Sequence, residues 1–232
     1  MKNDKQNAGT FPSEVAANYN QIMTYFDYDK NVDTFDKIVR ENLIPFPQMP
    51  LVLELGIGTG HFASRLVCRG YDVVGIDDSP RMLEELHKQY PSLDAKLQGI
   101  AELAIKYQSD VAVSAAGPIR FNYFEDEKVF ESYLPSWELT REAINRIWMS
   151  LSKGGLFIMS QNSDPVHPGF FKSTGDDMQI SDTMRYQKRE RRDEDYIYKN
   201  RKLFDNEEKL WEIEHRFSWS TPEVAEETLE EL

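Results

Sequence analysis

Residues Leu51 to Gly60 read LVLELGIGTG. Its first five residues are mostly apolar and predict a buried β-strand. Glycine then occupies every second position, at Gly56, Gly58 and Gly60. Because glycine leaves the main chain bare, a nucleotide-like ligand can approach this loop and the N-terminus of the helix that follows. The stretch therefore predicts a strand, a ligand-binding loop and a helix in succession.

The segments around this loop alternate between strand and helix patterns. Strands are predicted at residues 71–77, 93–98, 110–116 and 155–160, and helices at 60–70, 79–90 and 139–151. The helix at 79–90 has a clear start, because Ser79 suits the N-cap and Pro80 suits the first helical position. Strands joined by helices form a parallel sheet that is covered on both faces and binds ligands at the carboxyl ends of its strands. We therefore predict an α/β fold with a Rossmann-like, doubly wound, mainly parallel sheet.

The pattern changes after Ile180. Residues 182–192, 196–204 and 209–220 predict strands joined by charged turns, without a helix between them. In the last strand mostly apolar and polar residues alternate, so that one face is mostly apolar and must be covered. This face carries Trp211, Ile213, His215, Phe217 and Trp219. We expect an antiparallel β insert that roofs the active-site cleft above the parallel strands.

Composition limits the class of protein. The 232 residues contain no linker or internal repeat and predict a single domain, 1–232. A formal net charge of −13 argues against nucleic acid as a partner. The single Cys68 excludes an intrachain disulfide and a cysteine-cluster metal site, and we expect no metal. No apolar run is long enough for a membrane span or a signal peptide, so we expect a cytoplasmic protein with no membrane partner.

The residues around the loop narrow the choice of ligand. A dinucleotide fingerprint has the spacing G-x-G-x-x-G, but here the position of its third glycine is His61. Asp77 ends the second strand, where a carboxylate accepts the ribose hydroxyls of any adenosine-containing ligand. Glu54 stands just before the loop, and its negative charge repels a pyrophosphate but suits a ligand with an ammonium and a sulfonium group.

At these residues the sequence resembles the class I S-adenosylmethionine-dependent methyltransferases. The resemblance covers roughly residues 18–160 and rests on four segments: Glu54 to Gly60, Asp77 in VVGIDDSPRML, Asp110 to Gly117, and Leu151 to Ser160. The strands after Ile180 are similar to the substrate-covering insert of small-molecule N- and O-methyltransferases, including sugar amine N-methyltransferases. The resemblance implies a tail with lid helices at 1–45, a cofactor-binding core at 50–160 and substrate-covering strands at 178–220.

The resemblance also implies S-adenosyl-L-methionine as the cofactor and a set of residues that hold it. Tyr19, in the N-terminal lid, would close over the methionine end. The full set of expected cofactor-binding residues is Tyr19, Glu54, Gly56, Gly58, Gly60, Asp77, Asp78, Ile100, Ala101 and Ala115. The chain departs from the family after the third strand, because residues 98–101 contain no acid for the adenine amino group. Backbone groups and apolar packing are expected to hold the adenine instead.

The implied reaction is an in-line displacement, in which the protein aligns a nucleophile of a small-molecule acceptor with an activated methyl group and excludes water. An amine acceptor needs only to arrive neutral, whereas a hydroxyl benefits from a base; His167, His215 and Tyr123 are the candidates. The expected substrate-binding residues are Arg120, Asn122, Trp137, Gln161 and Asn162, and Arg120 would suit a carboxylate or phosphate. The oligomeric state is left open, with a homodimer considered.

Each of these assignments has a plainer alternative. The glycines also suit a tight turn, Glu54 a half-exposed strand end and Asp78 an exposed turn. Packing alone would explain Tyr19, and a structural hydrogen bond would explain His215. Two other functions stay open: an S-adenosylmethionine-binding protein without methyl transfer, and a dinucleotide-dependent oxidoreductase, which Glu54 and His61 disfavour.

Overall fold

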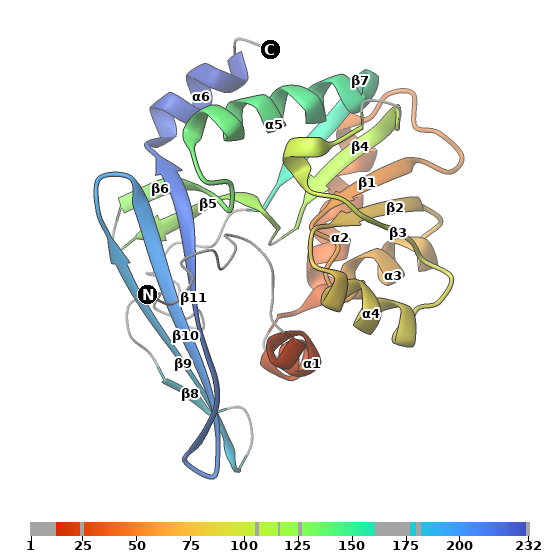
Figure 1. The fold of residues 1–232 in the computed structure, drawn as a ribbon. Helices are drawn as coiled ribbons and strands as arrows, with labels where there is room; N and C mark the ends of the chain where they lie inside the picture. The colour runs from red at the N-terminus through yellow and green to blue at the C-terminus, as the bar shows by residue number, and fades with distance from the viewer. Residues whose placement is uncertain are drawn as a thin grey trace.

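The computed structural model describes residues 13–23, 26–104, 107–115, 117–124, 127–160, 177–179 and 182–230. Its strands form two sheets, one of five parallel strands and one of six strands, which lie on opposite sides of the molecule in Figure 1. No helix in the described part of the chain is long and apolar enough to cross a membrane.

The parallel sheet is the predicted Rossmann-like core. It contains β1 (Leu51–Leu55), β2 (Asp72–Asp77), β3 (Asp94–Leu97), β4 (Ser109–Ser114) and β7 (Leu151–Met159), in the order β3-β2-β1-β4-β7. All four neighbouring pairs of strands are parallel. The α/β prediction is therefore confirmed.

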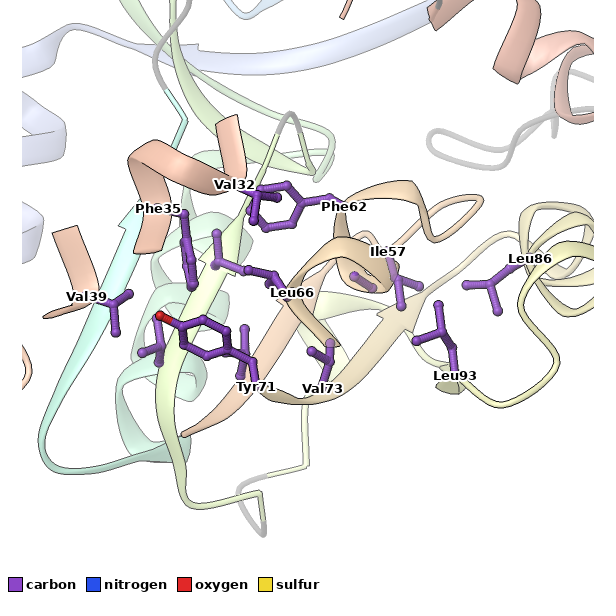
Figure 2. Packing of buried hydrophobic residues seen from close by; sticks show 14 of the residues in the cluster. Val32, Phe35, Val39, Ile57, Phe62, Leu66, Tyr71, Val73, Leu86 and Leu93 are labelled. Atoms are coloured by element: carbon purple, nitrogen blue, oxygen red, sulfur yellow. The ribbon is translucent and has the colours of Figure 1, made fainter. Parts of the chain in front are cut away.

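Helices cover both faces of this sheet because each central strand is apolar on both sides. On one face lie α2 (Tyr28–Asn42), α3 (His61–Cys68) and α4 (Pro80–Gln89). The other face is covered by α5 (Trp137–Ser150), by the 3₁₀ turn η2 (Ile100–Glu102) and by α6 (Pro222–Glu230). Within β1, Val52 belongs to the first core, while Leu53 and Leu55 belong to the second. Figure 2 shows the first core, where aromatic and aliphatic side chains from α2 and α3 meet those of the strands.

The helix starts follow the capping residues that the sequence provides. Ser79 accepts a hydrogen bond from the backbone N–H of Met82 at the start of α4, with Pro80 as its first residue. Ser136 likewise caps α5 by accepting from the N–H of Leu139. The helix therefore begins two residues before the predicted Leu139.

The second sheet is antiparallel and has the order β5-β6-β11-β10-β9-β8. The predicted three-stranded meander is present as β9 (Met184–Arg192), β10 (Tyr196–Asp205) and β11 (Glu208–Ser220), and β8 (Asp177–Gln179) is added at its edge. A hairpin of β5 (Ile119–Phe124) and β6 (Glu127–Ser132) extends the sheet on the other side. The sequence analysis places no element between residues 116 and 139, so this hairpin is an addition to the predicted fold.

Helix α1 (Ser13–Ile22) lies between the two sheets in Figure 1. Its Val15 and Ile22 share an apolar cluster with Trp211 and other residues of the antiparallel sheet. At the same helix, the hydroxyl of Thr59 donates a 2.7 Å hydrogen bond to Oδ1 of Asn20. Helix α1 therefore connects the loop after β1 to the antiparallel sheet.

Candidate functional site

The loop after β1 needs its glycines for three different reasons. All three have positive φ angles, +74° at Gly56, +56° at Gly58 and +81° at Gly60, which side chains other than glycine rarely adopt. A Cβ atom on Gly56 would lie 2.8 Å from Cδ of Pro118, and one on Gly60 would lie 3.0 Å from Leu86. A Cβ on Gly58 would meet nothing within 4 Å, because this residue borders an open cavity.

That cavity has a volume of about 310 Å³ and lies at the carboxyl ends of β1 and β2. Its walls come from the glycine loop, the end of β2, the segment after β3 and the segment after β6; they are Tyr19, Gly56, Gly58, Ile76, Asp77, Asp78, Met82, 98–102, Gly117, Pro118 and 133–135. A smaller pocket of about 40 Å³ shares Tyr19, Gly56 and Gly58 with it and reaches Glu54 and Ala115. The two spaces therefore meet at the glycine loop, beside α1.

Asp77 joins the glycine loop to the wall of the cavity. Its Oδ2 accepts a 2.8 Å hydrogen bond from the N–H of Gly58, and its Oδ1 accepts a 2.9 Å bond from the N–H of Ser79. Burial raises the pKa of Asp77 to about 6, although both backbone bonds act in the opposite direction. At neutral pH the carboxylate is mainly charged and keeps lone pairs for hydroxyl donors from a ligand. Asp78 lines the same wall but is exposed.

Glu54 is a buried acid at the end of β1, with an exposed fraction of 2%. Its Oε2 makes no hydrogen bond to any of the described residues. Burial first, and then the charge of Asp77, raise the pKa of Glu54 well above its usual value. A buried carboxyl group of this kind either stays protonated or takes up a cation. The smaller pocket that it lines therefore suits a positively charged group.

The far end of the cavity is mostly apolar. It is formed by Ile76, Met82 and the 3₁₀ turn that begins at Ile100. The Gln98 side chain is used locally, since its Nε2 donates to the Glu102 carbonyl at 2.6 Å and its Oε1 accepts from the Tyr107 hydroxyl. A flat heterocycle here would meet apolar side chains and backbone groups such as those of Ala101.

Two of the predicted substrate residues lie in a buried polar cluster. The Arg120 guanidinium donates to Oε2 of Glu131 at 3.3 Å, and Asn122 Nδ2 donates to Oε1 of Glu131 at 2.9 Å. Lys199 also pairs with Glu131 at 2.6 Å, and these contacts hold the pKa of Glu131 at about 2 against the effect of burial. The charge of Arg120 is therefore balanced within the protein.

The other predicted substrate and catalytic residues are distributed differently. Trp137 is the first residue of α5, and its ring packs edge-on against Phe130 at 5.5 Å. Tyr123 belongs to β5, but its side chain is not among the described ones. Gln161, Asn162 and His167 lie outside the described residues.

His215 faces the side of the cavity formed by Tyr133. Its ring lies 5.6 Å from the Tyr133 ring, edge to face, and its Nδ1 contacts the Arg201 guanidinium. Burial, and then the charges of Arg201 and Arg120, lower the pKa of His215 to about 3. The imidazole is therefore neutral at physiological pH and a weak proton acceptor.

Comparison with known proteins finds one matching domain family and several similar folds. A model described as a methyltransferase domain matches residues 52–134. The solved structure of an S-adenosylmethionine-dependent methyltransferase from Clostridium acetobutylicum has a TM-score of 0.70 at 20% identity, over 92% of this chain and 85% of that one. Residues 52–134 therefore match the methyltransferase domain family, and the chain shares the fold of the Clostridium acetobutylicum enzyme.

Other similar proteins differ in how much of this chain they match. CalS10 from Micromonospora echinaspora, an amino pentose methyltransferase solved with S-adenosylmethionine bound, has a TM-score of 0.64 at 16% identity over 94% of this chain and 86% of that one. At such identities the likeness establishes the fold. The uncharacterized methyltransferase Rv3342 of Mycobacterium tuberculosis is 43% identical over 65 residues, which span 28% of this chain and only 27% of that protein.

The residues at this site fit the cofactor that the matching domain family would bring. Glu54, whose Oε2 has no hydrogen-bond partner among the described residues, suits a methionine ammonium; the cavity at Gly58 leaves room for a ligand, and Asp77 suits ribose hydroxyls. The sequence analysis missed Met82, Pro118 and the segment 133–135 as cavity residues. Met82 alone carried a signal, since it falls within the quoted segment VVGIDDSPRML.

Proposed function

We propose that this protein transfers a methyl group from S-adenosylmethionine to a nitrogen or oxygen atom of a small-molecule acceptor. The observation that carries the proposal is the buried Glu54 carboxyl, whose Oε2 has no hydrogen-bond partner in the described part of the chain, beside the open space at Gly58. The carboxyl group supplies a counter-charge for a cationic ligand, and the open space can hold that ligand. A pyrophosphate, which is itself negative, would not need this carboxyl group. The match of residues 52–134 to the methyltransferase domain family supports the same reaction.

The charged ends of the cofactor have distinct partners in this proposal. The methionine ammonium pairs with Glu54 in the smaller pocket, which is also lined by Ala115 and Tyr19. The ribose hydroxyls donate to Asp77, and Asp78 lies beside it on the same wall. The adenine lies along the apolar end of the cavity, against Met82, Ile100 and Ala101. The glycine loop, from Gly56 to Gly60, holds the backbone close to the ligand.

The cofactor supplies a methyl group that its sulfonium sulfur already activates. The protein therefore has to align the acceptor atom with that methyl group and exclude water. Tyr19 on α1 borders both parts of the cavity and suits the role of a lid, while Tyr133 to Pro135 border the side nearest the antiparallel sheet. The acceptor enters on that side.

The choice of base follows from the acceptor atom. A neutral amine needs no base from the protein, and the amino pentose specificity of CalS10 makes an amine our preferred acceptor. For a hydroxyl acceptor, His167 and Tyr123 stay predictions. His215, with its pKa of about 3, is better suited to orient Arg201 and Tyr133 than to remove a proton.

Two broader expectations belong to this proposal. A cytoplasmic location is supported by the single Cys68 and the acidic, polar composition. Association into a homodimer stays a prediction, which sedimentation of the cofactor-bound protein would test.

The proposal is tested by calorimetry with S-adenosylmethionine and with NAD, followed by a methylation screen on amines, hydroxy compounds and sugars. We expect a dissociation constant of about 1 μM or lower for S-adenosylmethionine, equivalent to about −8 kcal/mol, and no binding of NAD. Mass spectrometry of ligand that copurifies with the protein gives an independent identification. Tight cofactor binding without transfer to any acceptor would favour a binding protein over an enzyme, and binding of NAD alone would reject the cofactor assignment.

A further inference from the structure

The antiparallel sheet has one face, called here the inner face, that packs against α1. Strand alternation places Lys199, Arg201 and Leu203 of β10 on it, and Leu203 shares the apolar cluster with Val15 and Ile22 of α1. Because α1 also carries Tyr19, which lines the cofactor cavity, the inner face is turned toward that cavity. The charged side chains of the inner face can therefore contact a methyl acceptor.

The centre of the inner face holds more cations than carboxylates. Among the described residues the cations are Arg120, Lys188, Lys199 and Arg201, and the carboxylates are Glu131 and Glu190. Both carboxylates are fully buried and already paired, Glu131 with Arg120 and Lys199, and Glu190 with Lys188 at 2.6 Å and Lys199 at 3.4 Å. Two positive charges are thus in excess at this place, although the whole chain is strongly acidic.

Arg201 is the cation without a carboxylate partner in the described part of the chain. Its guanidinium contacts Nδ1 of His215 and hydrogen-bonds the Tyr133 side chain, and both partners are uncharged. A guanidinium has five N–H donors in a planar fork that matches a carboxylate or phosphate. These two neutral contacts orient the group, and Glu190 acts on it through its charge, but no ion pair joins Glu190 to Arg201 among the described residues.

Lys188 lies directly opposite Arg201 on the neighbouring strand. Like charges that face each other across two strands destabilise a sheet, and Glu190, the carboxylate beside this pair, is shared between Lys188 and Lys199. Burial first, and then the charge of Lys199, lower the pKa of Lys188 to about 8. The Lys188 side chain nevertheless keeps an exposed fraction of 21%, whereas its partner Glu190 has none. Lys188 therefore keeps part of its side chain in contact with solvent, while Arg201 lies deeper.

We propose that Arg201 and Lys188 together bind an anionic group, a carboxylate or a phosphate, of the methyl acceptor. This rests on the proposed methyl transfer and adds a subsite for the acceptor to it. Tyr133 connects the subsite to the reaction, because its side chain lines the cofactor cavity and also bonds Arg201. An acceptor held by its anionic group at Arg201 thus extends past Tyr133 toward the cofactor. Arg120, which the sequence analysis expected to bind such an anion, is paired with Glu131 and belongs to the buried polar cluster.

The test uses two small anions as probes, inorganic phosphate and malonate, titrated against the full chain with S-adenosylhomocysteine bound. Sodium chloride at matched ionic strength corrects for general screening. The variants are Arg201→Gln, Lys188→Gln and the charge-keeping Arg201→Lys. Matched controls on the outer face of the same sheet are Lys202→Gln, which pairs with Glu212 there, and Arg216→Gln, which lies over the Tyr196 ring. Cofactor affinity is measured for every sample.

We expect at least one anion to bind and raise the melting temperature of the wild type and of both outer-face controls. Arg201→Gln and Lys188→Gln should weaken that binding by about tenfold or more, since each removes a charge-assisted contact, and Arg201→Lys should retain part of it. Preference for malonate identifies a carboxylate, and preference for phosphate identifies a phosphate.

The subsite is rejected if neither anion binds the wild type better than chloride does, or if Arg201→Gln binds as tightly as the wild type. Should Arg201→Gln fail to fold, Lys188→Gln and Arg201→Lys decide the matter by the same comparison. Failure of the proposed methyl transfer has a separate signature, because the cofactor itself would then not bind in the parallel titration.

Discussion

Replacing Gly58 by valine tests whether the loop after β1 is a ligand site or only a turn. The residue has a φ of +56°, and a Cβ built on it meets nothing within 4 Å, so the new side chain projects into the 310 Å³ cavity. There it occupies the space assigned to the cofactor. We expect the affinity for S-adenosylmethionine to fall at least 100-fold, which corresponds to about 2.7 kcal/mol. Alanine at the same position should cause a smaller loss.

Backbone strain is the competing explanation, and Gly70 provides the matched control. Gly70 also has a positive φ, +87°, and an added Cβ there also meets nothing within 4 Å, but it ends α3 and lines neither part of the cavity. Valine at either position should therefore lower the free energy of unfolding by a similar amount, about 1–3 kcal/mol. Only Gly58→Val should lose the cofactor.

The assay is calorimetric titration with S-adenosylmethionine, combined with thermal melts of all variants. If Gly58→Val binds the cofactor within a few fold of the wild type, the loop is merely a turn and the assignment of the site fails. Equal losses of affinity in Gly58→Val and Gly70→Val would point to strain in place of occupied space.

Three further predictions follow from the geometry of the site. Asp77→Asn should reduce cofactor affinity by about 10- to 100-fold in the same titration, because it removes the charge from the acceptor of the ribose hydroxyls and weakens the bond from Gly58; unchanged affinity would exclude Asp77 from the site. The affinity of the wild type should rise as the pH rises through about 6, because Asp77 has a pKa of about 6 and binds the cofactor as an anion. Glu54, whose pKa burial raises well above its usual value, should add to this pH dependence, so Glu54→Gln should weaken binding and make the profile less steep. A profile that Glu54→Gln leaves unaltered would contradict the role of Glu54. Trp211→Ala should lower the melting temperature and the cofactor affinity together, because Trp211 packs with Val15 and Ile22 of α1. Trp219→Ala should leave the cofactor affinity within a few fold of the wild type, because the Trp219 ring donates to the Asp193 carbonyl instead. Equal effects of the two changes would argue against α1 as a lid.

The raised pKa of Asp77 also has a consequence for the stability of the protein without cofactor. The pKa is 3.8 in the unfolded reference and about 6 in the fold, so the folded state binds the proton more tightly. The stabilising contribution of protonated Asp77 is complete below pH 4 and is lost as the pH rises through about 6. Cofactor binding therefore strengthens over the same interval in which the empty site loses stability.

The cofactor half of the site is predictable from the sequence because its determinants are local. Glu54, the three glycines and Asp77 fall within a single strand-loop-helix-strand unit, where strand ends and glycine spacing fix their relative positions. The sequence also shows that residues 98–101, after the third strand, contain no acid, and the structure shows what occupies that position instead. Gln98 there bonds Tyr107 and Glu102, and the neighbouring cavity walls are apolar.

The acceptor half depends on pairings that the sequence does not reveal. The sequence alone suggests that Arg120 is a free cation near the strand ends. Its partner Glu131, however, comes from the next strand of a hairpin, and Lys199, which also pairs with Glu131, comes from a strand 68 residues further on. Tyr133 carries no motif, and its place in the cavity wall depends on how β6 is added to the antiparallel sheet. The division of the chain at 50–160 and 178–220 stays a prediction.

The two halves of the site carry opposite charges, and this arrangement explains how the reacting molecules would be brought together. Glu54 and Asp77 are buried acids on the cofactor side, and each is easier to keep charged once a cation lies between them and the cavity. On the other side of Tyr133 the inner face of the antiparallel sheet has an excess of cations around Arg201 and Lys188. In the proposed reaction a cationic cofactor and an anionic acceptor would each be drawn to its own side, and exchanging them would place like charges together in a low-dielectric site. This separation of charge would keep the two molecules on opposite sides of Tyr133, which lines the cavity and hydrogen-bonds Arg201.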